Sequence, residues 1–196
     1  MAGELLAVVR EARGGSEEAF RELYREVQPG LLRYLRGMVG ADAEDLASET
    51  WLQIARDIRS FRDEGVGFRG WAVTIARHRA LDHMRRNRRR PVTDVSADVL
   101  TEMADWHDTA EQVIRLESTH ATIAFIATLP RDQAEAVLLR IVVGLDVEAA
   151  AQVMGKRAGA VRTATWRGLR RLSQRLAPDS ADGVTNAVRP TPRRAR

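Results

Sequence analysis

Residues 68–91 read FRGWAVTIARHRALDHMRRNRRRP, and this stretch decides the fold class. Its apolar residues recur at helical spacing and Pro91 cannot continue a helix, so we predict a basic helix that ends near Arg90. The helix carries Trp71 near its start and a dense run of arginines towards its end. Arginines suit a phosphate backbone, and an aromatic ring can stack on an unpaired base. The stretch therefore predicts an α-helix that binds nucleic acid.

The remainder of the chain shows the same helical spacing and no convincing alternating strand pattern. Asp42 and Asp146 are of the residue types that begin helices, whereas Gly40 is of the type that ends them. We expect Pro29 to kink or interrupt the first long helix. Further helices are predicted over residues 19–39, 42–60, 110–128, 133–143, 147–154 and 158–176.

The chain divides into two parts around a stretch that has weak periodicity and scattered acidic residues. We interpret residues 93–109 as a flexible acidic linker. Residues 178–196 are rich in proline, alanine and arginine, and we interpret them as a disordered tail. The predicted fold is all-α, with two small helical domains over residues 1–92 and 110–177. The second domain is expected to contain a helix-turn-helix.

A short helix, a turn at Gly155 and a longer basic helix form the predicted helix-turn-helix. An apolar stripe on the longer helix is expected to pack inward. This stripe consists of Val161, Thr165, Leu169 and Leu172. The opposite face carries Arg162, Thr163, Trp166, Arg167 and Arg170. Because no acidic residue occurs from Lys156 to Ala177, the pattern favours binding in the major groove of DNA over a merely solvated face.

The composition is that of a folded protein, since 44% of the 196 residues are hydrophobic and 30% are charged, with a net charge of +4. The absence of cysteine excludes disulfides and thiolate metal sites, and the four histidines form no helical metal-binding pair. The sequence has no run of about 18 apolar residues and no secretory signal at its start. We therefore expect a cytoplasmic protein with no cofactor, no metal and no membrane insertion.

The predicted helix over residues 42–60 has an acidic face formed by Glu44, Asp45 and Glu49. Acidic residues repel DNA, so this face meets either water or a basic protein partner, and composition alone favours water. Trp71 also has two interpretations. It is either an anchor in the core, as large aromatic residues usually are, or a platform at the edge of melted DNA.

Four segments, in order along the chain, resemble the successive conserved regions of an extracytoplasmic-function (ECF) sigma factor. They are DAEDLASETWL (42–52), FRGW followed by IARHRALD (68–82), LPRDQ (129–133) and the segment from Gly155 to Arg167. Sigma factors bind core RNA polymerase, direct it to promoters and help to open the duplex, and they have no catalytic activity of their own. The resemblance therefore implies core RNA polymerase, promoter DNA and an anti-sigma factor as partners.

The resemblance also implies roles for individual positions. The acidic helix would dock on polymerase through Asp45, Glu49 and Leu52, and the loop over residues 61–67 would capture a flipped base of the −10 element. The residues implied to contact the −10 region are Phe61, Phe68, Trp71, Arg77, His78, Asp82, Arg85 and Arg86. The residues implied to contact the −35 element are Lys156, Arg157, Arg162, Thr163, Trp166 and Arg167.

The chain departs from the family pattern at His78, where asparagine is common, and at Ala164, where a basic residue is common. A second hypothesis is a two-domain transcriptional regulator that uses only the helix-turn-helix and does not dock on polymerase. The acidic segment and the Trp71 helix in tandem favour the sigma factor, since a plain regulator needs neither. An enzyme is disfavoured because the sequence shows no convergent metal, nucleophile or phosphate-loop set.

Overall fold

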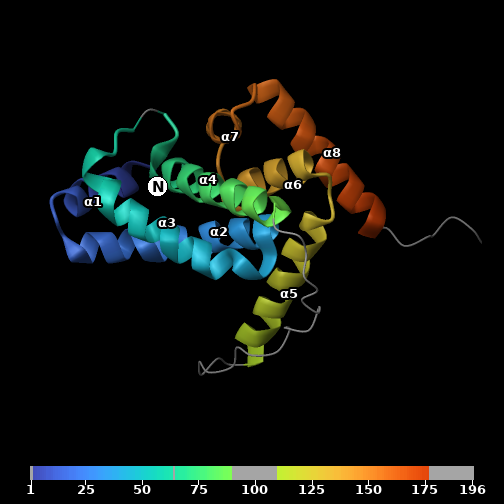
Figure 1. Ribbon diagram of the computed structural model, residues 1–196, viewed down its shortest axis with the longest axis horizontal. Coiled ribbons are helices and arrows are strands. Elements are labelled where there is room, and N and C mark those ends of the chain that lie inside the picture. The colour runs from blue at the N-terminus through green and yellow to red at the C-terminus, as the bar shows by residue number, and fades with distance from the viewer. Residues whose placement is uncertain (1, 64, 90–109, 177–196) are drawn as a thin grey trace, which may run out of the picture.

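The computed structural model describes residues 2–63, 65–89 and 110–176, and these residues are helical, with no strand among them (Figure 1). The first unit contains α1 (Ala2–Arg13), α2 (Glu17–Val39), η1 (Gly40–Asp42), α3 (Ala43–Asp57), η2 (Ile58–Ser60) and α4 (Gly67–Arg89). The second unit contains α5 (Ala110–Ala127), α6 (Arg131–Val137), the π-helical turn η3 (Leu138–Val142), α7 (Val147–Met154) and α8 (Ala158–Leu176). The predicted all-α fold with two helical units is confirmed. The predicted linker and tail lie outside the described residues.

The long helix α2 begins at a side-chain cap and runs past its proline. The backbone amide of Ala19 donates to Ser16 Oγ at 3.2 Å, which satisfies one of the free amides at the helix start. Pro29 lies inside the helix, which nevertheless continues without a break to Val39. The predicted interruption does not occur, because Val27 and Leu31 are buried on either side of the proline and hold the helix against the core.

Helix α1 was not predicted from the sequence. It packs against α2 and α4, with Val9 and Ala12 buried. The sequence does contain a helical pattern in this segment, since the apolar residues Leu5, Val8 and Val9 follow one another at spacings of three and one. The helix therefore extends the core of the first unit by one more apolar face.

The core of the first unit lies between α2, α3 and α4. Its fully buried residues include Leu23, Leu31, Leu35, Ile54, Ala72, Val73 and Ala76. The indole of Trp51 closes one edge of this core and donates through Nε1 to Gln28 Oε1 at 2.6 Å. The buried face of α4 is thereby fixed, so its opposite face is turned towards solvent.

The second unit places α8 across α6, and the contact depends on a small residue. A Cβ added at Gly168 would lie 2.8 Å from Val137 Cγ2 on α6, so only glycine permits this approach. Val161 and Leu172 are buried as predicted, but Leu169 is exposed. Leu169 was predicted to pack inward, but the close crossing at Gly168 turns this neighbouring residue away from α6.

The turn between α7 and α8 completes the predicted helix-turn-helix. Asp146 caps α7 by accepting a hydrogen bond from the Ala149 amide at 2.7 Å. Gly155 ends α7 in the left-handed region, with φ of 64°. Both positions were indicated by residue type alone, and they set the angle at which α8 leaves α7.

We expect Gly155→Ala to lower the free energy of unfolding by about 1–2 kcal/mol, because a side chain is strained in the left-handed region. The matched control is Gly159→Ala in α8, where an added Cβ meets nothing closer than an arginine nitrogen at 4.0 Å. That control is expected to stabilise by about 0.5–1 kcal/mol through helix propensity. Urea unfolding followed by circular dichroism measures both, and changes of the same sign would contradict this account of the turn.

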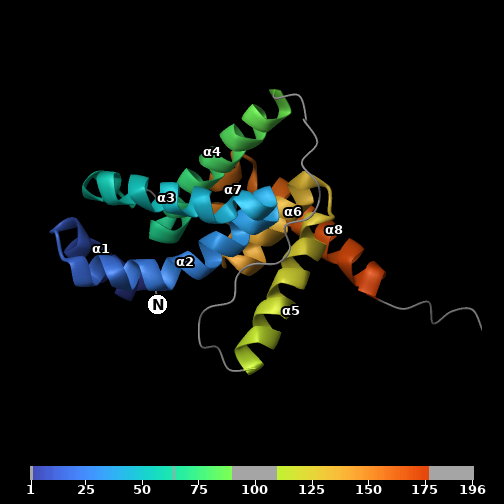
Figure 2. The ribbon, with the colours of Figure 1, turned by 60° about the horizontal axis from the view of Figure 1, so that its bottom comes forward.

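The two units pack directly on each other. Helix α2 contacts α5, α6 and η3, and α4 contacts α7. In Figure 2, α5 projects away from the first unit while α6 lies beside α2. The structure is therefore a closed arrangement of the two units, a feature that the sequence analysis left open.

Candidate nucleic-acid interface

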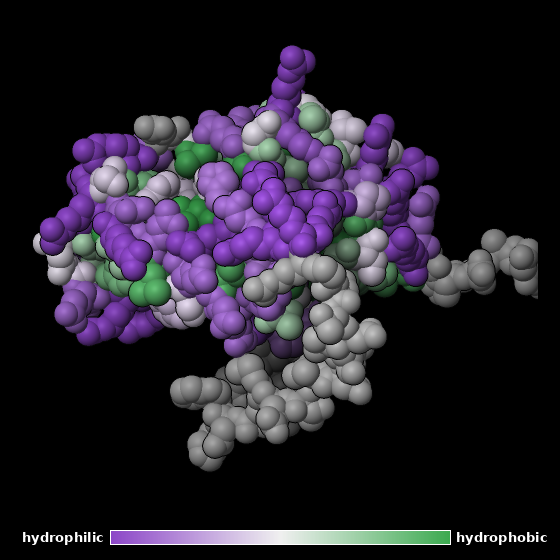
Figure 3. All heavy atoms as spheres, viewed as in Figure 1, coloured by the Kyte–Doolittle hydropathy of each residue, from purple (hydrophilic) through white to green (hydrophobic). Residues whose placement is uncertain are grey.

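Helix α4 presents a strongly basic outer surface. Its inner face is buried through residues such as Phe68, Val73 and Ala80, which leaves the polar positions outside. A groove between α3 and α4 is lined by Glu49, Arg79, Asp82, Arg85, Arg86 and Arg89. Figure 3 shows hydrophilic side chains gathered over the C-terminal half of α4. This surface suits phosphate groups, since its arginines stay charged at any relevant pH.

The predicted contacts on the outer half of α4 are exposed. His78, Asp82, Arg85 and Arg86 are all open to solvent. Asp82 Oδ1 accepts from Arg85 Nη1 at 2.9 Å, one helical turn away. The outer half of α4 thus carries an arginine cluster in which Asp82 pairs with Arg85.

The three aromatic residues at the start of α4 form one cluster. The ring centroids of Phe61, Phe68 and Trp71 lie 5.1–5.7 Å apart in tilted or edge-on arrangements. Phe61 and Phe68 are buried, whereas Trp71 is half-buried. In this structure, neither phenylalanine ring is accessible for stacking on a base. This burial follows from packing, because large aromatic rings gain more by burial than by exposure.

The loop that precedes α4 is shaped by one carboxylate. Asp63 Oδ1 accepts from the backbone amides of Gly65 at 3.1 Å and Gly67 at 3.0 Å. Both glycines have positive φ, which other residues rarely adopt. Within the predicted base-capturing loop, this carboxylate thus holds the described residues Asp63, Gly65 and Gly67 together.

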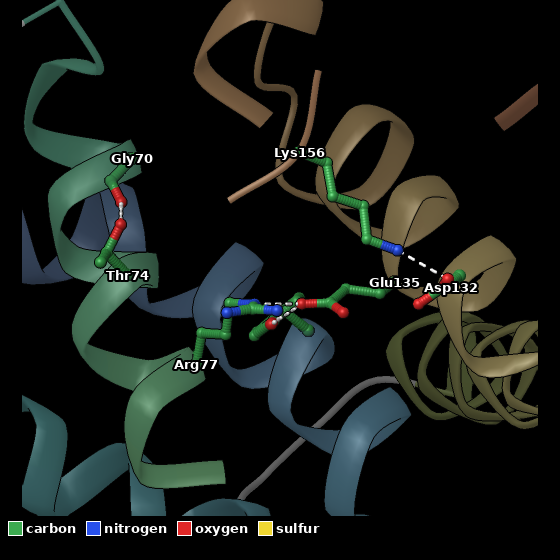
Figure 4. A network of polar contacts seen from close by, with 7 residues as sticks. Gly70, Thr74, Arg77, Asp132, Glu135 and Lys156 are labelled. Atoms are coloured by element: carbon green, nitrogen blue, oxygen red, sulfur yellow. Dashed lines mark hydrogen bonds and ion pairs between the residues drawn. The ribbon is translucent and has the colours of Figure 1, made fainter. Parts of the chain in front are cut away.

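Arg77 lies at the interface between the two units, not on an open DNA-binding face. Its Nε donates to Glu135 Oε1 at 2.5 Å (Figure 4). Tyr34 Oη donates to the same oxygen at 3.3 Å. Glu135 is only 2% exposed, and the Arg77 side chain is 16% exposed. Arg77 was predicted to contact DNA, but here it compensates a buried carboxylate.

The buried environment shifts the pKa of the Tyr34 hydroxyl. Burial raises its pKa well above the usual value, and the carboxylate of Glu135 raises the pKa further, while Arg77 and Arg131 act in the opposite direction. The neutral hydroxyl therefore remains the donor to Glu135 throughout the physiological range.

We expect stability to fall at alkaline pH because of Tyr34. A folded-state pKa above the unfolded value of about 10 means that the stabilisation is complete below that pH and is lost as pH rises towards the folded value. Thermal unfolding measured from pH 8 to pH 11 should therefore decline more steeply in the wild type than in Tyr34→Phe. Equal slopes would contradict the assignment.

The outer face of α3 is acidic and carries an exposed leucine. Glu44 Oε1 accepts from Arg36 at 2.8 Å and Glu49 Oε2 accepts from Arg79 at 2.7 Å, while Asp45 is open to solvent. Leu52, one turn further along, is 60% exposed. All three predicted docking residues therefore lie on one accessible face of α3.

The outer face of α8 is open and basic. Trp166 is 59% exposed, and the Arg170 guanidinium lies 5.2 Å from its ring centroid. The other predicted contacts, Arg157, Arg162, Thr163 and Arg167, are exposed too. Among the described residues, two acidic side chains reach this basic face: Asp132 pairs with Lys156 at 2.6 Å and Glu148 approaches Arg162 at 4.0 Å. The arrangement suits a helix that enters the major groove.

The described residues contain no group of three or more histidine or acidic side chains arranged to hold a metal ion. None of the helices in those same residues is long and apolar enough to cross a membrane.

Comparisons with known proteins agree with this geometry. The family "Sigma-70 region 2" matches residues 23–90, and "Sigma-70, region 4" matches residues 120–172. The ECF RNA polymerase sigma factor BldN of Streptomyces coelicolor is 36% identical over 179 residues, which cover 90% of this chain and 67% of BldN. The ECF RNA polymerase sigma factor SigD of Mycobacterium tuberculosis is 35% identical over 187 residues, which cover 90% of this chain and 86% of SigD.

A solved structure supports the fold. The sigma factor RpoE in complex with the anti-sigma factor NepR from Bartonella quintana superposes with a TM-score of 0.61 at 23% identity, covering 82% of this chain and 98% of RpoE. With the two matched regions in order and the two relatives aligned over nine-tenths of its length, the chain belongs to the ECF sigma factors of the sigma-70 family.

Proposed function

We propose that three separate surfaces divide the work of this sigma factor. The acidic face of α3 docks on core RNA polymerase, the outer face of α4 engages the −10 region, and the outer face of α8 reads the −35 element. The protein carries out no catalysis itself. Its contribution is to give polymerase two DNA contacts, each of which raises the effective concentration of the other.

The exposure of Leu52 next to Asp45 and Glu49 carries the docking proposal. Most of the Leu52 side chain is exposed, and the carboxylates beside it favour a basic protein surface. A regulator that binds DNA alone has no use for such a face, so this observation favours the sigma factor over the two-domain regulator.

For the −10 region, the support comes from the exposed His78, Arg85 and Arg86 on α4. Trp71 is partly accessible at the start of the same helix, with the loop over residues 61–67 beside it. Stacking returns about 1–3 kcal/mol per base, which is too little to melt a duplex without the contacts that polymerase adds. Phe61 and Phe68 support this site from below by packing under Trp71.

For the −35 element, the support comes from Arg162, Trp166 and Arg167 on the open face of α8. Arginine can bind guanine edges through two hydrogen bonds, and an indole can contact methyl groups or sugars. Lys156, Arg157 and Thr163 lie at the start of the same face, where phosphate contacts would set the register of the helix.

We also place the protein in the cytoplasm, where its polymerase and promoter partners are found, and we propose an anti-sigma factor as a further partner. Such an inhibitor would cover the docking and DNA faces, and the exposed Leu52 and Trp166 would offer it apolar contacts. Recovery of the tagged protein from its native cell with polymerase alone, under every growth condition, would count against that partner.

Fluorescence anisotropy with a labelled promoter duplex tests the proposed function. The protein alone is expected to bind weakly, whereas the protein with core polymerase is expected to bind tightly and to make bases in the −10 region reactive to permanganate. Tight binding by the protein alone, unchanged by polymerase, would support the two-domain regulator instead.

A further inference from the structure

Lys156 is the only lysine in the chain. The sequence holds 31 lysine and arginine residues, and every one of them except Lys156 is an arginine. A guanidinium stays protonated at any relevant pH, whereas a lysine amine can lose its proton and react with an acyl donor. Among the cationic side chains of this protein, Lys156 is therefore the one whose charge acetylation can remove.

This lysine lies in the turn of the helix-turn-helix. Its backbone amide donates to the Ala151 carbonyl at 2.9 Å, and Gly155 before it has the left-handed conformation that ends α7. Helix α8 begins two residues later, at Ala158. In a helix-turn-helix, contacts to DNA phosphates around the turn hold the reading helix in register. The charge of the Lys156 side chain therefore bears directly on DNA binding.

The side chain of Lys156 is paired with a carboxylate. Its Nζ lies 2.6 Å from Asp132 Oδ2 at the start of α6, as Figure 4 shows. The Lys156 side chain is 33% exposed and the Asp132 side chain is 68% exposed, so a small acyl donor can reach the pair from solvent. Arg131 and Arg157 adjoin the two partners in sequence and are exposed too. Their positive charge attracts an anionic donor to this turn.

Acetylation changes the charge of this pair in the direction that opposes DNA binding. With the ammonium present, the pair of Lys156 and Asp132 is neutral. An acetamide at Lys156 leaves the Asp132 carboxylate without its counter-charge, so the turn gains one negative charge beside the DNA backbone. Loss of a phosphate contact and gain of a repulsion therefore act together.

We propose that Lys156 is an acetylation site that weakens DNA binding by α8, with acetyl phosphate as the acyl donor. The Nζ amine, having lost one proton to water, attacks the acetyl carbon. An amide bond forms, the bond from that carbon to the phosphate oxygen breaks, and inorganic phosphate leaves with the second proton that the nitrogen gives up. This inference rests on the proposed role of α8 at the −35 element.

Peptide mass spectrometry of the full-length protein tests the site. After incubation with acetyl phosphate, we expect an acetyl group on Lys156, and we expect the same group on a measurable fraction of the protein recovered from its native cell. Because the chain has no second lysine, the only other amine that can react is the α-amino group. An unmodified Lys156 in the treated protein, or in the protein from growing and stationary cells alike, would overturn the proposal.

Promoter binding by the treated protein with core polymerase tests the effect. We expect acetylation to weaken binding by about tenfold, and the slope of log K against log salt to fall by about 1, as the loss of one phosphate contact predicts. Promoters with intact and scrambled −35 elements should be weakened by similar factors, because a phosphate contact does not read sequence. Unchanged affinity after acetylation would overturn the proposal.

The matched control moves the single lysine along α8. Arg171→Lys combined with Lys156→Arg places it where the native arginine donates to Gln133 Oε1 at 3.3 Å, towards the second unit's own helices. Acetylation of this variant removes the same charge from the same helix, but its promoter affinity should equal that of its own untreated sample. If both proteins were weakened equally by treatment, the effect would be one of net charge or of the α-amino group, and the role of Lys156 would be wrong.

Asp132→Asn tests the released carboxylate. In this background, acetylation of Lys156 exposes no unpaired negative charge, so it should weaken promoter binding by a smaller factor than in the wild type. An equal factor would overturn the part assigned to Asp132. If the untreated wild type with core polymerase did not bind promoters at all, the proposed function would fail, while the mass spectra would still decide whether Lys156 is acetylated.

Discussion

Asp45→Arg combined with Glu49→Arg is expected to abolish association with core RNA polymerase. Both carboxylates lie on the exposed face of α3, and the double change reverses its charge. Like charges brought together at an interface cost several kcal/mol, so we expect affinity to fall by about a hundredfold or more. The substituted residue 49 would also face Arg79, whose Nη1 now lies 2.7 Å from the carboxylate. Biolayer interferometry with immobilised core polymerase measures the loss directly.

The matched control carries the same charge change on a different helix. Glu18→Arg with Glu22→Arg alters two exposed acidic residues of α2, away from the docking face. We expect this control to retain polymerase binding within a few-fold. If both double variants lost affinity equally, the effect would be one of net charge, and α3 would not be the docking face.

Arg162→Ala combined with Arg167→Ala is expected to lower promoter use while leaving polymerase binding intact. Each arginine that grips a base edge through two hydrogen bonds contributes about 1–3 kcal/mol of discrimination, so the pair should change promoter affinity by roughly a hundredfold. The variant should be less active than the wild type on a promoter with an intact −35 element. The two proteins should be equally active on a promoter with a scrambled −35 element, because scrambling already removes the contacts that the two arginines make. Transcription from promoters with intact and scrambled −35 elements, at fixed polymerase concentration, measures this difference.

Arg171→Ala with Arg175→Ala provides the control on the same helix. Arg171 donates to Gln133 Oε1 at 3.3 Å and Arg175 donates to Thr128 Oγ1 at 2.6 Å, so both turn towards the second unit's own helices. The control removes the same charge from α8 but should not reduce discrimination between the two promoters. An equal loss of discrimination in both variants would show that the face around Trp166 does not read sequence.

Local features of the chain were predictable because their causes are local. The residue types of Asp146 and Gly155 predicted where α7 begins and ends. The absence of acidic residues from α8 predicted its basic face. The acidic face of α3 was equally predictable, although the docking role proposed for it came from family resemblance and not from composition.

Features that depend on distant contacts were not predictable in this way. Nothing in the sequence shows that Arg77 meets Glu135, 58 positions away, or that Gly168 turns Leu169 outward. One weak signal was present, since Glu135 interrupts a run of small and apolar residues that would otherwise be wholly buried. A charge in such a run requires a partner, but the identity of that partner follows only from the packing of the two units.

Transcription by purified core polymerase on a library of genomic fragments, with the start sites mapped, tests the central claim most directly. Adding this protein is expected to produce new transcripts whose start sites share one −10 and one −35 sequence, and the transcripts should disappear with the Asp45→Arg and Glu49→Arg variant. The claim would be contradicted by an unchanged set of transcripts together with tight binding of the protein alone to a DNA operator.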